Sequence, residues 1–140
     1  MDLKLEVVVV PVSDVDRAKA FYERVGFHLD VDHSEGDAFR VVQLTPPGSA
    51  CSITIGTGLG VDMPPGSIQG LHLVVADIEA VRADFVERAV DVSEVFHFEA
   101  GGQVPGPDPE RRDYGSYLSF SDPDGNSSVV QEARRTEPGA

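Results

Sequence analysis

Two stretches of the chain begin alike, with a run of β-branched residues, then an acidic residue, then an amphipathic pattern. They cover residues 9–16 and 72–79, and Asp14 and Asp77 occupy the same place in each, 63 residues apart. A carboxylate there accepts hydrogen bonds from the free N–H groups that begin a helix. Apolar residues follow at spacings of three and four: Val15, Ala18, Phe21, Tyr22 and Val25, then Ile78, Val81, Phe85 and Ala89. An internal repeat with one helix in each half is therefore predicted, and Gly26 is expected to end the first helix.

Short segments typical of β-strands follow each predicted helix, and turn residues separate them. They cover residues 27–33, 38–45 and 50–55 in the first half; the second half has a strand over 69–76, a helix over 77–89 and strands over 92–98, 115–121 and 127–133. Each half is therefore predicted to fold as β-α-β-β-β. We expect a first module over residues 1–57, a linker over 58–68, a second module over 69–133 and a disordered tail over 134–140, all within one domain.

A long interruption separates two of the predicted strands in the second half. Residues 99–113 carry a Gly-Gly pair, three prolines and the pair Arg111-Arg112, and they are predicted to form a loop. Loops of this length are often lids or binding loops. A lid over a site and an open excursion both remain possible readings of this segment.

Charge and composition exclude several classes of function. The 140 residues include 24 acidic and 11 basic side chains, a net charge of −13, so no nucleic-acid or membrane-surface partner is expected. The single cysteine, Cys51, allows no internal disulfide. No apolar run approaches the roughly 20 residues that span a bilayer, and the first residues lack a signal-peptide pattern. We therefore expect a cytoplasmic protein.

Several short strings occur in an order that resembles the vicinal oxygen chelate superfamily, which contains glyoxalases, bleomycin-resistance proteins and extradiol dioxygenases. The strings are Pro-Val-Ser-Asp-Val-Asp-Arg-Ala at residues 11–18, Phe21-Tyr22, Gly26-Phe27, and Ser-Asp-Pro-Asp-Gly-Asn at residues 121–126. The resemblance covers about residues 3 to 133. It implies an α+β fold in which two βαβββ modules form a curled mixed sheet around a cavity, commonly completed in a homodimer.

The resemblance also implies four positions at which metal-using relatives carry ligands. These positions hold Val7, Gly70 and Val129, and aligning residues 47–50 with residues 123–126 adds Ile53. None of the four has a side-chain donor for a divalent ion. The four histidines, His28, His33, His72 and His97, lie on separate segments without a ligand-pair spacing. No metal and no other cofactor is therefore expected.

A metal-free cavity would be lined by residues on the same faces as those four positions. His72 lies two residues after Gly70 and shares its face, because strand side chains alternate. The expected lining is Val7, Val9, Ile53, His72, Val129 and Gln131. Arg40, among apolar neighbours, needs either an acidic partner such as Asp30, Asp32 or Asp37, or an anionic group of a ligand. Tyr117 could pack in the core or stack on a flat ligand.

Three functions remain open at this point. The first is a small-molecule binding protein, for instance one that sequesters a natural product, with a mostly apolar site. The second is a metal-independent lyase, isomerase or cyclase with His72 as the candidate catalytic acid or base, and with Arg40 or Tyr117 stabilising negative charge. The third is a structural or regulatory dimer. Fold alone does not choose between them, so whether the protein is an enzyme stays undecided.

Overall fold

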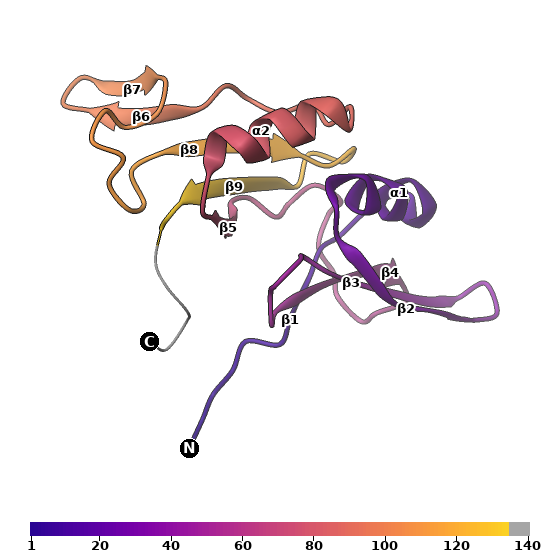
Figure 1. Cartoon of the computed structure of the whole chain (residues 1–140). Helices are drawn as coiled ribbons and strands as arrows, with labels where there is room; N and C mark the ends of the chain where they lie inside the picture. Colours follow the sequence, from indigo (N-terminus) through magenta and orange to yellow (C-terminus); the bar gives the residue numbers. More distant parts are fainter. Residues whose placement is uncertain (135–140) are drawn as a thin grey trace. The chain divides into compact units, whose positions relative to one another are not determined.

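Residues 1–134 are described by the computed structural model of the chain, and they divide into two units (Figure 1). Unit 1 contains Met1–Gln69 and Asp122–Asn126, and unit 2 contains Gly70–Ser121 together with the residues from Ser127 onward. Each unit has one helix and one mixed sheet, so the predicted α+β class is confirmed. Apart from Arg134, the tail expected over 134–140 lies outside the described residues.

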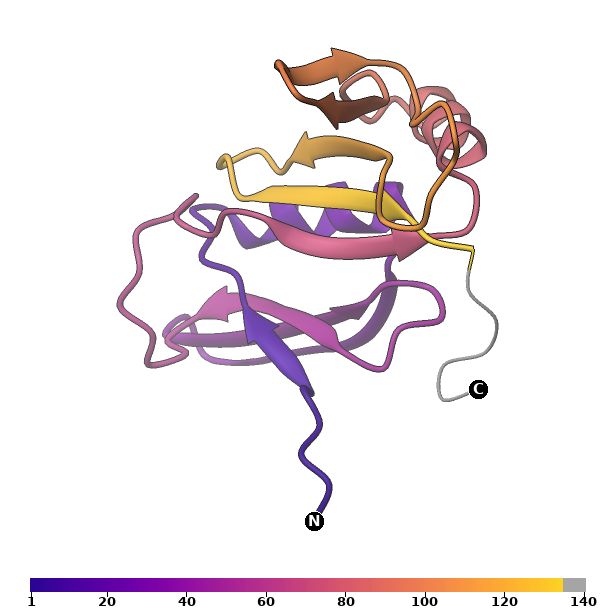
Figure 2. The same ribbon diagram turned by 90° about the vertical axis from the view of Figure 1, so that its left-hand side faces the viewer.

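Unit 1 forms a four-stranded sheet in the order β1-β4-β3-β2. Its elements are β1 (Val7–Val9), α1 (Val15–Val25), β2 (His28–Glu35), β3 (Phe39–Thr45) and β4 (Ser52–Thr57). The edge strand β1 runs parallel to β4, whereas the other neighbours are antiparallel (Figure 2). Three predicted strands after the helix are present, each shifted by one or two residues.

The first predicted helix begins and ends where its capping residues allow. Asp14 accepts a hydrogen bond from the backbone N–H of Arg17 at 3.1 Å, and Gly26 ends the helix with φ of 119°. That conformation favours glycine, because a side chain would clash there. The apolar stripe of α1 is buried, as are alternate residues of β3 and β4: Ala18, Phe21, Tyr22, Val25, Val42, Leu44, Ile53 and Ile55. The core of unit 1 therefore lies between α1 and one face of the sheet.

The turn at residues 122–126 belongs to unit 1, although it joins two strands of unit 2. The Tyr22 hydroxyl donates to the Asp122 carboxylate at 2.8 Å, and the Asn126 side chain donates to the Pro11 carbonyl at 2.8 Å. Burial, together with the charge of Asp122, holds the pKa of the Tyr22 phenol well above its usual range. Residues 122–126 therefore form a turn that is packed against the helix and loops of unit 1.

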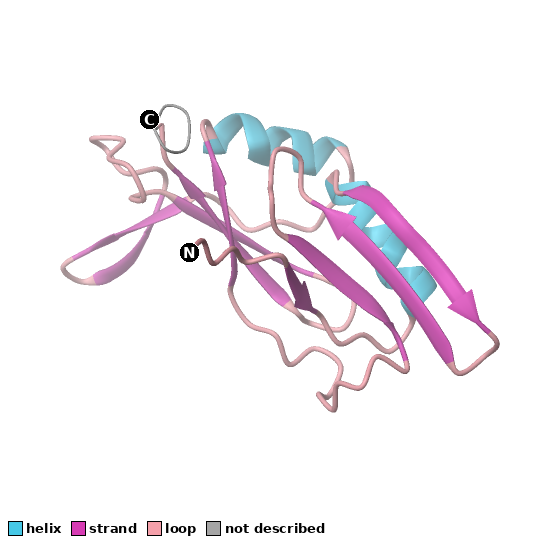
Figure 3. Cartoon of the chain, turned by 90° about the horizontal axis from the view of Figure 1, so that it is seen from below, coloured by secondary structure: helices cyan, strands magenta, loops and turns pink. Residues whose placement is uncertain are grey.

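Unit 2 forms a five-stranded sheet in the order β5-β9-β8-β6-β7, and Figure 3 distinguishes its strands from its helix by colour. The elements are β5 (Leu71–Val75), α2 (Ile78–Glu87), β6 (Phe96–Glu99), β7 (Gly102–Pro105), β8 (Tyr117–Ser121) and β9 (Ser127–Glu132). Helix α2 packs against β8 and β9. No helix within residues 1–134 is long and apolar enough to cross a membrane.

The segment predicted as a loop over 99–113 differs from the expectation. It contains β7, which pairs antiparallel with β6 and extends the sheet by one strand. Only Val104 of Gly102–Pro105 is aliphatic, so the segment lacks the alternating pattern that predicts a strand. The observed strand β6 starts only at Phe96, so it is shorter than the strand predicted over 92–98. Val92 makes an isolated bridge to Phe120 instead.

Candidate functional site

One face of the unit 2 sheet carries α2, and among the described residues of that unit no helix lies on the opposite face (Figure 1). Leu118, Phe120, Val130 and Glu132 are buried on the α2 side. Alternate residues of the same strands point to the other face and are only half-buried: Tyr117, Ser119, Val129 and Gln131. This helix-free face of unit 2 is the candidate functional site.

Strand pairing brings four of the residues expected from the sequence together on this face. His72 lies opposite Val129 in the parallel pair of β5 and β9, and Gln131 lies opposite Tyr117 in the antiparallel pair of β9 and β8. Residues directly opposite in neighbouring strands share one face of the sheet. His72, Tyr117, Val129 and Gln131 are therefore neighbours. The alternation of side chains along a strand predicted this shared face for His72, Val129 and Gln131, but not for Tyr117.

His72 is exposed, and its ring is held by Gln131. The Nδ1 atom of His72 lies 3.0 Å from Oε1 of Gln131, and Nε2 of Gln131 donates to the carbonyl of Tyr114 at 3.5 Å. The amide oxygen of Gln131 can only accept, so Nδ1 carries the proton of the neutral imidazole. The Nε2 atom of His72 then keeps its lone pair and can accept a hydrogen bond or a proton.

Beside this polar pair lies a cluster of three aromatic rings, Phe96, Phe98 and Tyr117. Phe96 and Tyr117 stack at 5.6 Å with 12° between their planes, and Phe98 meets both rings edge-on, at 5.8 and 5.3 Å. Phe98 is 55% exposed although it is fully apolar. Sequence reasoning named only Tyr117, but the alternation of Phe96, His97 and Phe98 marks one face of a strand and could have revealed the other two.

The segment after β7 is tied to the buried side of the sheet. Glu132, 1% exposed, accepts hydrogen bonds from Arg111 at 2.9 and 2.5 Å and from the N–H of Ile78 at 3.0 Å. The Arg111 guanidinium lowers the pKa of the Glu132 carboxyl, and Glu132 in turn raises that of Arg111. The N–H of Tyr114 donates to the Glu132 carbonyl at 2.7 Å. These contacts fix Tyr114 beside Gln131.

A second cluster holds the same segment in place from within. The buried carboxylate of Asp108 accepts two hydrogen bonds from the Arg112 guanidinium, at 2.8 and 3.0 Å. The backbone N–H of Asp108 donates to the Ser116 hydroxyl at 2.9 Å. The pairing with Arg112 holds the pKa of Asp108 well below its usual range. Residues 106–116 are therefore a structured connection, built from ion pairs, between β7 and β8.

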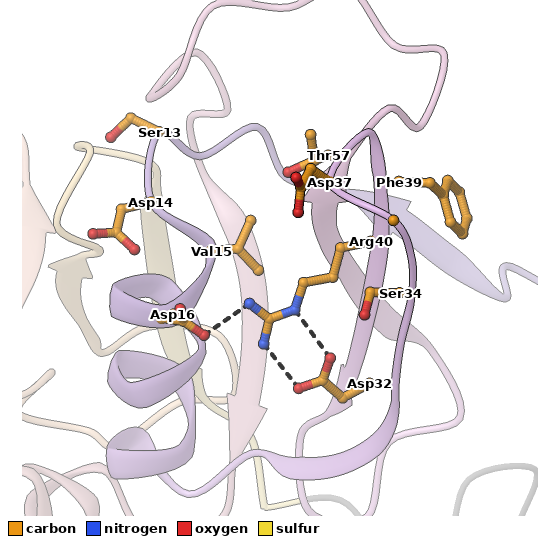
Figure 4. Close-up of a pocket in the computed structure, with 11 residues that line it drawn as sticks. Ser13, Asp14, Val15, Asp16, Asp32, Ser34, Asp37, Phe39, Arg40 and Thr57 are labelled. Carbon is orange, nitrogen blue, oxygen red and sulfur yellow. Dashed lines mark hydrogen bonds and ion pairs between the residues drawn. The ribbon is translucent and has the colours of Figure 1, made fainter.

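Arg40 lies elsewhere, in unit 1, at the wall of an open hollow of about 770 Å³ (Figure 4). Its Nε and Nη2 atoms donate to the Asp32 carboxylate at 3.0 and 2.9 Å, and Nη1 donates to Asp16 at 2.7 Å. Lys19 adds a third cation–carboxylate contact, to Asp32 at 2.8 Å. Arg40, assisted by Lys19, holds the pKa of the Asp32 carboxyl well below its usual range. The sequence left open whether Arg40 pairs with an acidic side chain or with an anionic group of a ligand, and in the structure it pairs with Asp32 and Asp16.

The register of unit 1 corrects the position assigned to Ile53. Val8 lies opposite Ile53 and Val9 lies opposite Thr54, so Ile53 does not share a face with Val7 and Val9. Ile53 is 5% exposed and belongs to the core. The alignment of turns that selected Ile53 was therefore wrong by one residue, because strand pairing and not turn residues sets the register.

Thr54 therefore takes the position that the sequence had assigned to Ile53. His72 pairs with Val129 as Val9 pairs with Thr54, and His72 and Val9 are themselves 63 residues apart. Thr54 is thus the counterpart of Val129. Within residues 1–134, no group of three or more His, Cys, Asp or Glu side chains could hold a metal ion.

Comparison with known families identifies the fold. The model of the Glyoxalase/Bleomycin resistance protein/Dioxygenase superfamily matches residues 4–129. The chain belongs to this superfamily. That membership confirms the resemblance carried by residues 11–18 and 121–126.

Several proteins are similar to this superfamily member, two of them with solved structures. TnmS3, an antibiotic binding protein from Streptomyces sp. CB03234, is 34% identical with a TM-score of 0.71, covering 94% of this chain and 97% of that one. A glyoxalase/bleomycin resistance protein from the same strain is 35% identical with a TM-score of 0.68, covering 92% and 100%. The uncharacterized protein YetH of Bacillus subtilis is 25% identical, covering 89% of this chain and 94% of its own.

Proposed function

We propose that this superfamily member binds a small organic molecule with a flat aromatic part on the helix-free face of unit 2. The observation that carries the proposal is the cluster of Phe96, Phe98 and Tyr117, which lies beside the hydrogen-bonded pair of His72 and Gln131. Phe98 is exposed, and the other two rings are half-buried. Exposed apolar side chains next to oriented polar groups are typical of ligand sites.

Each part of this face has a distinct role in the proposed binding. A flat ring system can stack on or meet edge-on the three aromatic rings, gaining about 0.5–1.5 kcal/mol per ring pair beyond the area it buries. The Nε2 atom of His72 offers an acceptor beside the rings, and Val129 adds an apolar surface between the polar groups. The similarity to TnmS3, 34% identical and named as an antibiotic binding protein, supports a natural product as the ligand.

The orientation of His72 supports a second candidate function, that of a metal-independent lyase, isomerase or cyclase. A general base needs its ring fixed by a second group, and Gln131 supplies that contact at 3.0 Å. Sequestration needs only affinity, whereas catalysis needs the lone pair on Nε2. The two functions therefore differ in how strongly they depend on His72.

The decisive experiment titrates the protein with the fluorescent aromatic probe 1-anilinonaphthalene-8-sulfonate and then displaces it with bleomycin and with polycyclic aromatic antibiotics. Phe98→Ala and Tyr117→Ala are expected to weaken probe binding at least about tenfold. The matched control is Val86→Ala, since Val86 is an exposed apolar residue on α2. Equal affinity of the Phe98 variant and the wild type would contradict the proposed site.

The same ligands distinguish the two functions through His72→Ala. A binding protein should lose affinity only a few-fold, because one hydrogen bond to a neutral group contributes about 0.5–1.5 kcal/mol. An enzyme should lose nearly all conversion of the bound molecule, measured by chromatography of the ligand after incubation. An unchanged ligand with wild-type protein supports binding alone.

A further inference from the structure

An open hollow of about 340 Å³ in unit 2 is lined by α2 and not by the helix-free face. Its lining comes from one side of α2, from the two residues before β6 and from the residue after β7: Glu79, Arg82, Ala83, Glu94, Val95 and Gly106. The volume lies at the lower end of the range for small-molecule sites. Two of these residues carry opposite charges that no side chain of the fold neutralises.

Arg82 is half-buried, and one hydrogen bond fixes its guanidinium. The Nε atom of Arg82 donates to the carbonyl of Ser93 at 2.9 Å. Ser93 is itself held by β8, since its N–H donates to the Ser119 carbonyl and its hydroxyl accepts from the Ser119 N–H, both at 2.9 Å. Among residues 1–134, no acceptor is hydrogen-bonded to Nη1 or Nη2 of Arg82. The far end of an oriented guanidinium is therefore unpaired.

The other half-buried arginines of the described chain have the partners that Arg82 lacks. Arg40 and Arg111 each donate through Nε and Nη2 to one carboxylate and through Nη1 to a second. A planar guanidinium binds both oxygens of a carboxylate through parallel N–H groups, and a half-buried cation without such a partner is costly. The unpaired edge of Arg82 is thus suited to a carboxylate supplied by a ligand.

Glu94 supplies the opposite charge at the same hollow. It is exposed, and its carboxylate makes no ion pair with a cation of the described residues. Glu79, the other carboxylate of the lining, is already paired with Arg111 at 2.8 Å. Arg82 and Glu94 therefore line one hollow without pairing with each other, so a ligand that carries both charges would satisfy both residues.

We propose that this hollow binds a small zwitterion, with its carboxylate on Arg82 and its ammonium group on Glu94. A simple anion would be repelled by two lining carboxylates and by a net charge of −13, whereas a zwitterion has no net charge. Ala83 and Val95 form the apolar part of the lining and suit a short aliphatic side chain. An α-amino acid such as leucine combines these features.

Calorimetric titration with leucine and two of its derivatives tests whether both charges are needed. N-acetylleucine keeps the carboxylate but has no ammonium group, and leucinamide keeps the ammonium group but has no carboxylate. Leucine is expected to bind, and each derivative should bind at least about tenfold more weakly, because a hydrogen bond between charged groups is lost. Equal affinity for leucine and either derivative, or no binding of leucine at about 10 mM, would overturn the proposal.

Substitutions assign each charge of the ligand to one residue. Arg82→Gln should weaken leucine binding about tenfold and change leucinamide binding less than about twofold. Glu94→Gln should weaken leucine binding as much and change N-acetylleucine binding less than about twofold. The matched controls are Arg88→Gln and Glu87→Gln, since both residues are exposed at the end of α2. A similar loss in the controls would mean that surface charge, and not this hollow, determines the affinity.

Two further variants separate the hollow from the rest of the molecule. Arg82→Lys keeps the positive charge but not the planar group, so it should bind leucine with an affinity between those of the wild type and Arg82→Gln. Unchanged circular dichroism would show that the variants fold, and Glu94→Gln tests the hollow at an exposed position in any case. Phe98→Ala removes a ring of the helix-free face and should leave leucine binding unchanged within about twofold. Loss of leucine binding in this variant would overturn the separate site.

Discussion

At the scale of single residues, the most informative group is His97, whose ring is buried. Its Nδ1 atom lies 2.7 Å from the carbonyl of Gly106, and its Nε2 atom lies 2.7 Å from the Glu99 carboxylate. Both partners only accept, so the ring needs a proton on each nitrogen to make both bonds. The bond to Glu99, then the one to Gly106, raises the pKa of His97 above its ordinary value.

This raised pKa predicts how stability depends on pH. The contribution of His97 is fully present below the pKa of an unfolded histidine, about 6.5, and is lost as the pH rises through the higher folded value. The melting temperature of His97→Gln should therefore lie several degrees below that of the wild type at pH 6. By pH 9 the difference should be smaller. Thermal unfolding followed by circular dichroism measures both.

A control for this pH dependence is His28→Gln, since the side chain of His28 is 78% exposed. The exposed ring makes no buried hydrogen bond, so its loss should change the melting temperature little at either pH. A gap between wild type and His97→Gln that widens with rising pH would contradict the doubly protonated ring.

The buried ion pair of Glu132 and Arg111 gives a second prediction for single residues. Glu132→Gln places an amide N–H₂ against guanidinium donors and leaves the half-buried charge of Arg111 without its main partner. We expect a loss of about 3–5 kcal/mol in the free energy of unfolding, measured by urea denaturation. Glu79 also pairs with Arg111, at 2.8 Å, but is exposed, so Glu79→Gln should cost less than about 1 kcal/mol. Similar losses in both variants would argue against a buried pair.

At the scale of elements, local chemistry predicted the helices well and the strands less well. Asp14 and Gly26 set the ends of α1 through their own backbone geometry, so a sequence pattern suffices for that helix. The hairpin strand β7 depends on pairing with β6, and its residues 102–105 carry no alternating pattern. The faces of Ile53 and Thr54 likewise depend on the partner strand. Register is a long-range property, which is why it escaped a local interpretation.

The turn over residues 122–126 supports a prediction at the same scale. Asn126 donates to the Pro11 carbonyl and accepts from the N–H of Ile68, at 2.8 and 3.0 Å, so its side chain joins three separate stretches of unit 1. Asn126→Ala leaves the N–H of Ile68 without this acceptor, whereas the Pro11 carbonyl still accepts from the N–H of Gly66 at 3.2 Å, so the free energy of unfolding should fall by about 1–3 kcal/mol. Pro123→Ala, at an exposed position of the same turn, is the control and should change it by less than about 1 kcal/mol. Denaturant titration compares them.

At the scale of the whole molecule, a net charge of −13 affects how two copies approach each other. Like-charged proteins repel over distances of about the Debye length, which falls from about 30 Å at 0.01 M salt to about 8 Å at 0.15 M. Attraction between surfaces that touch acts only at contact. Long-range repulsion and short-range attraction thus oppose each other, and salt weakens the repulsion more strongly.

Association of the full chain is therefore expected to strengthen as salt is added. Sedimentation equilibrium at 20 and 200 mM sodium chloride should show a several-fold higher association constant at the higher salt. Association that falls steadily with salt would mean that attraction between opposite charges dominates the encounter. In that case the acidic surface of one copy must meet a basic surface of the other.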